Sequence, residues 1–155
     1  MQKEVNIIYI SLSGNTKKFI QKLTADFQEK AIATTTLNIK ENPQMQEISD
    51  PFVCFLPAYL NGGNGINNGY TEILTTILKK FLAYHNNYQK CYGIIGSGNR
   101  NFNKQFALTA KQYAKTFGFP FLAEFELCGS KDDRKQIMQI ILAAQAAARQ
   151  REEKF

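Results

Sequence analysis

The residues best suited to bind a ligand lie in one short stretch near the start of the chain. Hydroxyl and amide donors surround a glycine there, in the order Ser11, Ser13, Gly14, Asn15 and Thr16. An apolar run precedes this stretch and a helical pattern follows it, so it is expected to lead into a helix N-terminus. Such a terminus presents unpaired N–H groups and the positive end of the helix dipole. The expected chemistry is the binding of a small anion, most simply one phosphate.

The same residue types are favoured helix N-caps, so an ordinary capped turn is an equally good interpretation of this stretch alone. No Gly-Lys-Ser/Thr follows it, which excludes a Walker A loop, and it lacks the spacing Gly-x-Gly-x-x-Gly. It does resemble the phosphate loop of flavodoxins, a Ser/Thr-x-Ser/Thr-Gly-x-Thr pattern after the first strand. In that family the loop holds the monophosphate of FMN.

Length and charge limit the classes of protein to consider. A chain of 155 residues suits a single domain, expected over 1–155, with a substantial core. The 19 Lys and Arg exceed the 13 Asp and Glu, and the net charge of +6 favours an anionic ligand or an acidic partner. These basic residues are scattered without a basic-aromatic stripe, so no nucleic-acid partner is expected. With no signal peptide and no membrane-length apolar run, we expect a cytoplasmic protein without a membrane partner.

Cysteine and histidine provide no evident metal or nucleophilic site. Cys54, Cys91 and Cys128 are widely spaced, lack a Cys-x-x-Cys pair and fall in or beside apolar runs, so buried free thiols are expected. His85 is the single histidine and lies in a polar stretch. We therefore predict neither a metal site nor a catalytic side chain.

The elements that must position the anion site follow from apolar patterning. Three short runs are mainly apolar on both faces, as in central strands of a parallel sheet: Val5–Ile10, Phe52–Leu56 and Lys90–Gly96. Two others alternate, as edge strands do: Thr34–Ile39 and Phe119–Leu127. Helical spacing marks Asn15–Glu29, Tyr70–Tyr84, a segment ending near Phe117, and a last helix after Gly129-Ser130 whose tail, Arg149–Phe155, is expected to fray.

Strands that alternate with helices predict an α/β fold with a parallel sheet. Placing the alternating strands at the edges gives a doubly wound, five-stranded sheet of order 2-1-3-4-5, the flavodoxin-like arrangement. In such sheets ligands bind beyond the carboxyl ends of the strands, at the switch point between the first and third strands.

Three loops rich in Gly, Ser and Asn are expected to converge there: Ser11–Thr16, Pro57–Gly65 and Gly96–Phe102. A phosphate on one loop and a planar ring between the other two describes an FMN site. Tyr59 and Phe102 would stack on the ring, or alternatively pack against the domain as ordinary loop aromatics. A peptide able to flip at Gly62 or Gly63 could serve the oxidised and reduced states of the flavin.

Two further motifs resemble signatures of the NrdI family, the flavodoxin-like proteins of class Ib ribonucleotide reductase systems. They are Gly96-Ser-Gly-Asn-Arg-Asn-Phe102 and Phe125-Glu-Leu-Cys-Gly-Ser130, and Pro57-Ala-Tyr59 is similar to the same family. The resemblance implies a protein that binds FMN and is reduced by a reductase, here unidentified. It further implies delivery of a reduced-oxygen, superoxide-type oxidant to the dimanganese small subunit NrdF, where a tyrosyl radical is generated.

The resemblance also implies roles for individual residues. The phosphate is expected on Ser11, Ser13, Gly14, Asn15 and Thr16. One side of the flavin would be bordered by Pro57, Ala58, Tyr59, Asn61, Gly62 and Gly63, and the other by Ser97, Gly98, Asn99, Asn101 and Phe102. Ala58 departs from the pattern, because many relatives carry Thr at that position. No side chain need act as an acid or base, since the chemistry is that of the cofactor.

Two functions from other classes remain open at this point. The first is a general flavodoxin-type electron carrier, and the second is an interaction module that retains the fold without a flavin. The intact stretch from Ser11 to Thr16 disfavours the second. Arg100 could brace its loop or act electrostatically on the ligand, and Glu126 could accept hydrogen bonds near the flavin or face solvent.

Overall fold

A computed structural model describes residues 4–10, 15–42, 44–57, 77–98, 108–126 and 130–153. Within these residues the strands are β1 (Glu4–Tyr9), β2 (Ala33–Asn38), β3 (Phe52–Pro57), β4 (Cys91–Gly98) and β5 (Phe121–Glu126). The helices are α1 (Asn15–Glu29), a segment at 77–83 that runs into the 3₁₀ element η2 (Tyr84–Lys90), α3 (Leu108–Phe117) and α4 (Lys131–Glu153). No helix within the described ranges has both the length and the apolarity to cross a bilayer.

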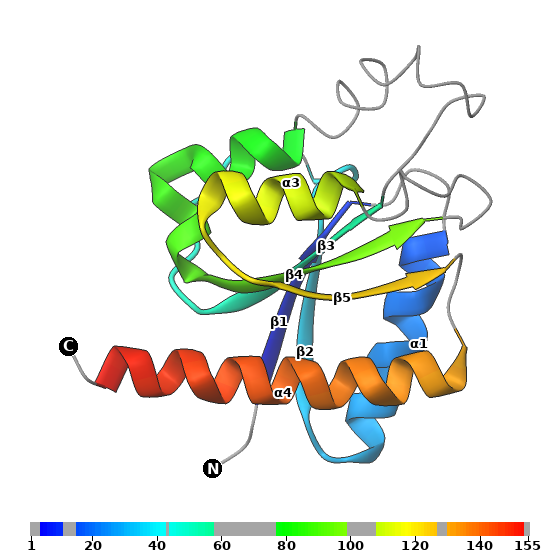
Figure 1. The fold of residues 1–155 in the computed structure, drawn as a ribbon. Helices are drawn as coiled ribbons and strands as arrows, with labels where there is room; N and C mark the ends of the chain where they lie inside the picture. Colours follow the sequence, from blue (N-terminus) through cyan, green and yellow to red (C-terminus); the bar gives the residue numbers. More distant parts are fainter. Residues whose placement is uncertain are drawn as a thin grey trace, which may run out of the picture.

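All strand pairs are parallel, and the sheet order is β2-β1-β3-β4-β5. The order predicted from the sequence is confirmed, with the two alternating strands at the edges. Figure 1 shows helices on both faces of this sheet, with α1 and α4 together on one face and α3 on the other. The strand and helix boundaries differ from the predicted ones by one or two residues for most elements.

The core beneath α1 and α4 is built around three phenylalanines from different elements. Phe19 of α1 stacks on Phe125 of β5 with ring centroids 3.9 Å apart, and Phe55 of β3 lies 6.0 Å from Phe19. α4 begins with a reciprocal cap, because the backbone N–H of Ser130 donates to the Asp133 carboxylate and that of Asp133 to the Ser130 hydroxyl. These contacts hold both helices against one face of the sheet.

The opposite core is formed by the 77–83 segment and α3. Leu78, Phe81 and Leu82 are fully buried, as is Ala110 of α3. Below this segment, the buried Asn87 side chain accepts from the N–H of Ile48 and donates to the carbonyls of Gln46 and Phe81. Residues 77–84 of the predicted helix Tyr70–Tyr84 lie inside the described ranges. Residues 77–83 are α-helical, as predicted, and Tyr84 begins η2.

Two irregularities interrupt the sheet at its amino-terminal side. Tyr92 is an extra residue of β4 relative to β3, and Leu122 is an extra residue of β5 relative to β4. As a result Phe121 packs in the α3-side core, whereas Ala123 packs in the α1 and α4-side core. The alternation predicted along Phe119–Leu127 is therefore broken at Leu122.

The prediction that Arg149–Phe155 frays is wrong for its first five residues, because α4 continues to Glu153. Gln145 is buried and donates a hydrogen bond to the backbone carbonyl of Glu4. Ala148 packs against the core in the following turn. These contacts anchor the last turns, and the Arg, Gln and Glu residues beyond them have high helix propensity.

Gly93 is where the two irregularities meet, and it makes a stability test possible. A Cβ at Gly93 would lie 2.3 Å from Cδ1 and 2.4 Å from Cγ of Leu122. We expect Gly93→Ala to lower the free energy of unfolding by about 1–3 kcal/mol, the usual cost of overpacking. Urea unfolding measures it, and in a Leu122→Ala background the cost of Gly93→Ala should fall by at least half.

Gly118→Ala provides the matched control. Gly118 has φ +85° and nothing within 4 Å of an added Cβ, so its cost is conformational and should not change with Leu122→Ala. Equal costs of Gly93→Ala with and without the Leu122 side chain would contradict the proposed clash.

Candidate functional site

The candidate ligand site lies at the carboxyl edge of the sheet. Of the residues predicted to bind FMN, Asn15, Thr16, Pro57, Ser97 and Gly98 are within the described ranges, at the start of α1 and the ends of β3 and β4. Outside those ranges lie Ser11, Ser13, Gly14, Ala58, Tyr59, Asn61, Gly62, Gly63, Asn99, Asn101 and Phe102, together with Arg100. The site is therefore built here from its described strand ends and helix start.

A buried hydrogen bond joins two of the predicted ligand residues. The hydroxyls of Thr16 and Ser97 lie 3.0 Å apart although they are 81 positions apart in the sequence. Thr16 is 2% exposed and Ser97 is 4% exposed. Thr16 and Ser97 were both predicted to contact the ligand, but no pattern in the sequence indicates that their side chains would form a hydrogen bond with each other. The contact connects the first turn of α1 to the carboxyl end of strand β4.

The strand register brings the remaining described residues to the same edge. Pro57 is the neighbour of Ser97 across β3 and β4, and Gly98 is the neighbour of Glu126 across β4 and β5. The role of Glu126 was left open by the sequence. The backbone of Glu126 pairs with Gly98, which places Glu126 at the carboxyl edge of the sheet. The ends of β3, β4 and β5 and the start of α1 therefore lie at the same carboxyl edge of the sheet.

The N-termini of α1 and α4 differ in their electrostatics. The first turn of α4 contains Asp132 and Asp133, and Asp133 accepts a backbone N–H there. The first turn of α1 contains no acidic residue and includes Lys17 and Lys18. The start of α1 consequently has no carboxylate of its own near its N–H groups, and a bound anion is electrostatically favourable at that end.

A second polar group lies beside the start of α1. The ammonium of Lys17 is 2.8 Å from a carboxylate oxygen of Glu41, and this hydrogen bond raises the pKa of Lys17. Tyr9, at the end of β1, is buried, and burial is the main reason that its pKa is raised. Lys17 therefore remains a cation, and Tyr9 a neutral phenol, across the physiological pH range.

The buried cysteines are unsuited to nucleophilic chemistry. Cys54 and Cys91 are free and buried, as predicted, whereas Cys128 lies outside the described residues. Burial raises the pKa of Cys54 well above its ordinary value and that of Cys91 to about 12. Because the thiolate is the reactive form, both side chains are inert packing groups in the folded protein.

The Thr16–Ser97 contact leads to a double-mutant prediction. Thr16→Val or Ser97→Ala alone leaves a buried hydroxyl without its partner and should lower the free energy of unfolding by about 1–2 kcal/mol. The double variant should lose clearly less than the sum, because both polar groups are then removed. Urea unfolding of the FMN-free protein measures all three.

Thr24→Val is the control for this cycle, because the Thr24 hydroxyl donates to the carbonyl of Ile20 in its own helix. Its effect should add to that of Ser97→Ala. Strict additivity of Thr16→Val and Ser97→Ala would rule out an energetic coupling between the two hydroxyls.

Thiol accessibility provides a second test. In a Cys128→Ser variant at pH 8, Cys54 and Cys91 should not react with Ellman's reagent until urea unfolds the protein. Their folded pKa values lie above the unfolded value, so their contribution to stability is complete below about pH 8.5 and is lost as the pH rises further. The urea midpoint should accordingly fall between pH 8 and pH 10, whereas rapid labelling of the native protein would contradict the buried state.

Comparison with known proteins agrees with this architecture. Residues 7–139 match the family model described as NrdI flavodoxin-like. An NrdI-like protein of Streptococcus pneumoniae is 50% identical over 146 residues, which cover 90% of this chain and 93% of that protein. Protein NrdI of Mycoplasma genitalium is 33% identical over 135 residues, 87% of this chain and 80% of that protein.

Among solved structures, oxidised flavodoxin 1 from Bacillus cereus superposes with a TM-score of 0.56 at 15% identity, covering 94% of this chain and 98% of that one. At this identity the similarity concerns the fold, which is that of flavodoxins. The family model, by contrast, spans most of the chain, from within β1 through β5 and into α4. The chain therefore belongs to the NrdI flavodoxin-like family.

Proposed function

We propose that this protein binds FMN and supplies a superoxide-type oxidant to the dimanganese small subunit NrdF of a class Ib ribonucleotide reductase. The oxidant would be used there to assemble the tyrosyl radical. The observation that carries the proposal is the match of residues 7–139 to the NrdI flavodoxin-like family. The relatives named NrdI or NrdI-like support it, at identities of 33% and 50%.

The described residues at the carboxyl edge are chemically suited to FMN. The phosphate needs hydrogen-bond donors and a positive potential, which the start of α1 offers with no acidic residue in its first turn. The loop 11–16 would hold this phosphate, and the Thr16–Ser97 hydrogen bond would keep the helix start fixed relative to the end of β4. The loops that continue β3 and β4, with Tyr59 and Phe102, would border the ring.

When bound, FMN would supply the transfer of electrons to dioxygen. The side chains of this protein then have three tasks, which are to bind the phosphate, to orient the ring between two loops and to control its exposure to solvent. None of these tasks requires an acid, a base or a nucleophile, in agreement with the inert thiols Cys54 and Cys91. An unidentified reductase would be the electron donor.

A general electron carrier is the competing function, and charge favours the reductase activator. Flavodoxins that act as carriers are usually acidic, whereas this chain has a net charge of +6. A basic protein would associate most readily with an acidic partner surface. NrdF is the partner that the family implies.

The decisive experiment has two steps. First, the purified protein is expected to be yellow, or to become yellow with added FMN, and to release FMN identified by mass. Second, the FMN-loaded protein is reduced without oxygen, mixed with manganese-loaded NrdF and exposed to dioxygen. Electron paramagnetic resonance should then detect a tyrosyl radical, because the oxidant reaches the metal site within the complex.

Free FMN reduced to the same extent is the control for the second step, and it should form little or no radical. A protein that binds FMN but forms no more radical than this control would be an electron carrier. A colourless protein that takes up no FMN would exclude both flavin functions.

A further inference from the structure

An ion pair holds the side chain of Lys17 beside the start of α1. Lys17 is the third residue of this helix, about 3 Å along the helix axis from Asn15, the first residue. Its ammonium is 2.8 Å from a carboxylate oxygen of Glu41, which follows β2. A positive charge on the first turn of α1 is therefore matched by a negative charge from another part of the chain.

The position of Glu41 is set by the turn after β2. Asn38 is buried at the end of this strand, where it is the neighbour of Tyr9 across β1 and β2. The side-chain oxygen of Asn38 accepts the N–H of Lys40, and its carbonyl accepts the N–H of Asn42. These hydrogen bonds shape the turn that contains Glu41, so the backbone helps to keep its carboxylate close to α1.

The two charges act on groups at the carboxyl end of β1. Tyr9 is the last residue of this strand, and burial is the main reason that its pKa is raised. The Glu41 carboxylate raises the pKa of Tyr9 further, whereas the Lys17 ammonium acts to lower it. An anion bound at the start of α1 would experience the same two opposing charges.

The phosphate of FMN is such an anion. Like other phosphate monoesters, it carries a charge of about −1.5 to −2 near pH 7. It would be attracted by Lys17 and repelled by Glu41, and the two effects largely cancel while the ion pair is intact. The side chains of Lys17 and Glu41 are 41% and 54% exposed, so solvent and salt screen each effect to a few-fold change in affinity.

We propose that Glu41 sets the affinity of this protein for the phosphate of FMN by holding the Lys17 ammonium in the ion pair. Glu41 is a positioning residue, because it acts through Lys17. The phosphate is then recognised by the N–H groups of α1 and the uncharged donors of the loop before it, without a net contribution from the pair. The inference rests on the proposed function, because that function requires FMN to bind at this edge.

The test compares FMN with riboflavin, which lacks the phosphate, by the fluorescence of flavin titrated with flavin-free full-length protein. Glu41→Gln should tighten FMN binding about threefold, because Lys17 keeps its charge and loses the opposing carboxylate. Lys17→Gln should weaken it about threefold, because the Glu41 carboxylate then repels the phosphate. Riboflavin affinity should not change in either variant, and raising the salt concentration should reduce both FMN effects.

The double variant tests whether the two residues act as a unit. Lys17→Gln with Glu41→Gln removes both charges and should bind FMN within about twofold of the unmodified protein. A loss as large as that of Lys17→Gln alone would contradict the role of Glu41, because the lysine would then act independently of its partner.

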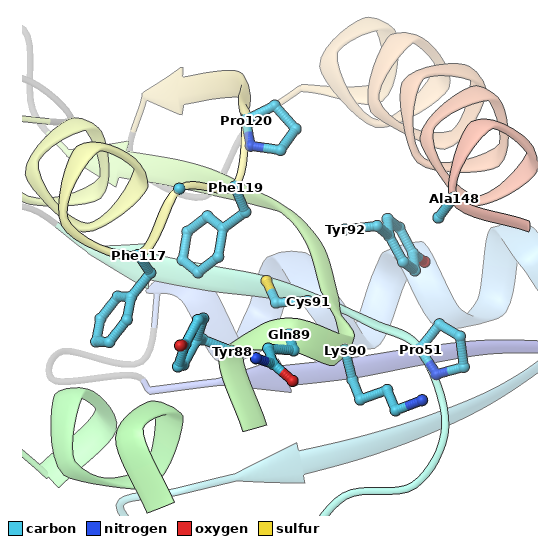
Figure 2. Close-up of a pocket in the computed structure, with 11 residues that line it drawn as sticks. Pro51, Tyr88, Gln89, Lys90, Cys91, Tyr92, Phe117, Phe119, Pro120 and Ala148 are labelled. Atoms are coloured by element: carbon cyan, nitrogen blue, oxygen red, sulfur yellow. The ribbon is translucent and has the colours of Figure 1, made fainter. Parts of the chain in front are cut away.

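Asp26→Asn and Lys90→Gln are the matched controls for removing one negative or one positive charge. Asp26 also forms an ion pair, with 2.7 Å between its carboxylate and Nε of Arg134, but it lies about 16 Å along α1 from Asn15. Lys90 precedes β4 at the opposite end of the sheet, where Figure 2 shows it beside Pro51. Both lie beyond the Debye length of about 8 Å at physiological salt, so neither variant should change FMN affinity.

The outcomes separate this inference from the proposed function. If Glu41→Gln binds FMN as the unmodified protein does, or if riboflavin affinity changes as much as FMN affinity, the ion pair is purely structural and the inference is overturned while the FMN function stands. If the unmodified protein binds no FMN, the proposed function fails, and inorganic phosphate becomes the probe, followed by the amide resonances of Thr16 and Lys17. Glu41→Gln should then bind phosphate about threefold more tightly, and equal affinities or no binding would overturn the inference as well.

Discussion

The burial of the central strands on both faces is the constraint on which the rest of this structure depends. In β3 the five residues Phe52–Leu56 are all fully buried, so helices must cover both sides of the sheet. Such strands have no solvent-facing side chains on which a site could be built. Ligands can reach them only at their two ends, and the candidate FMN site lies at the carboxyl end.

At the carboxyl end, one hydrogen bond links elements that are not neighbours in the sheet. β3 lies between β1 and β4, yet Thr16, just after β1, reaches Ser97 at the end of β4. The contact is buried, so it acts in a low dielectric and without competition from bulk water. In the proposed function, a helix start fixed in this way would serve as a stable platform for the phosphate of FMN, since its N–H groups would keep their direction.

At the amino-terminal end, the two bulges decide which side chains face which core. The extra residue at Tyr92 places its ring in the core beside α4, while the preceding Cys91 packs on the opposite face. Gly93 has no side chain because Leu122, the extra residue of β5, fills that space. The Tyr92 hydroxyl is buried there and has no hydrogen-bond partner within the described part of the chain. The pairing of β4 with its neighbours is thus irregular at its amino-terminal end and regular toward its carboxyl end.

The amino-acid sequence by itself determined the strand order, the identity of the two edge strands and the carboxyl edge of the sheet as the expected FMN site. A strand buried on both faces is apolar at nearly every position, whereas a strand buried on one face alternates, so the pattern of apolar residues distinguishes the two. It also indicated Thr16 and Ser97 as polar residues at that edge. The pairing of these hydroxyls, the bulges at Tyr92 and Leu122 and the continuation of α4 were decided only by the tertiary structure. Each depends on contacts between residues far apart in the chain, and local periodicity carries no information about such contacts.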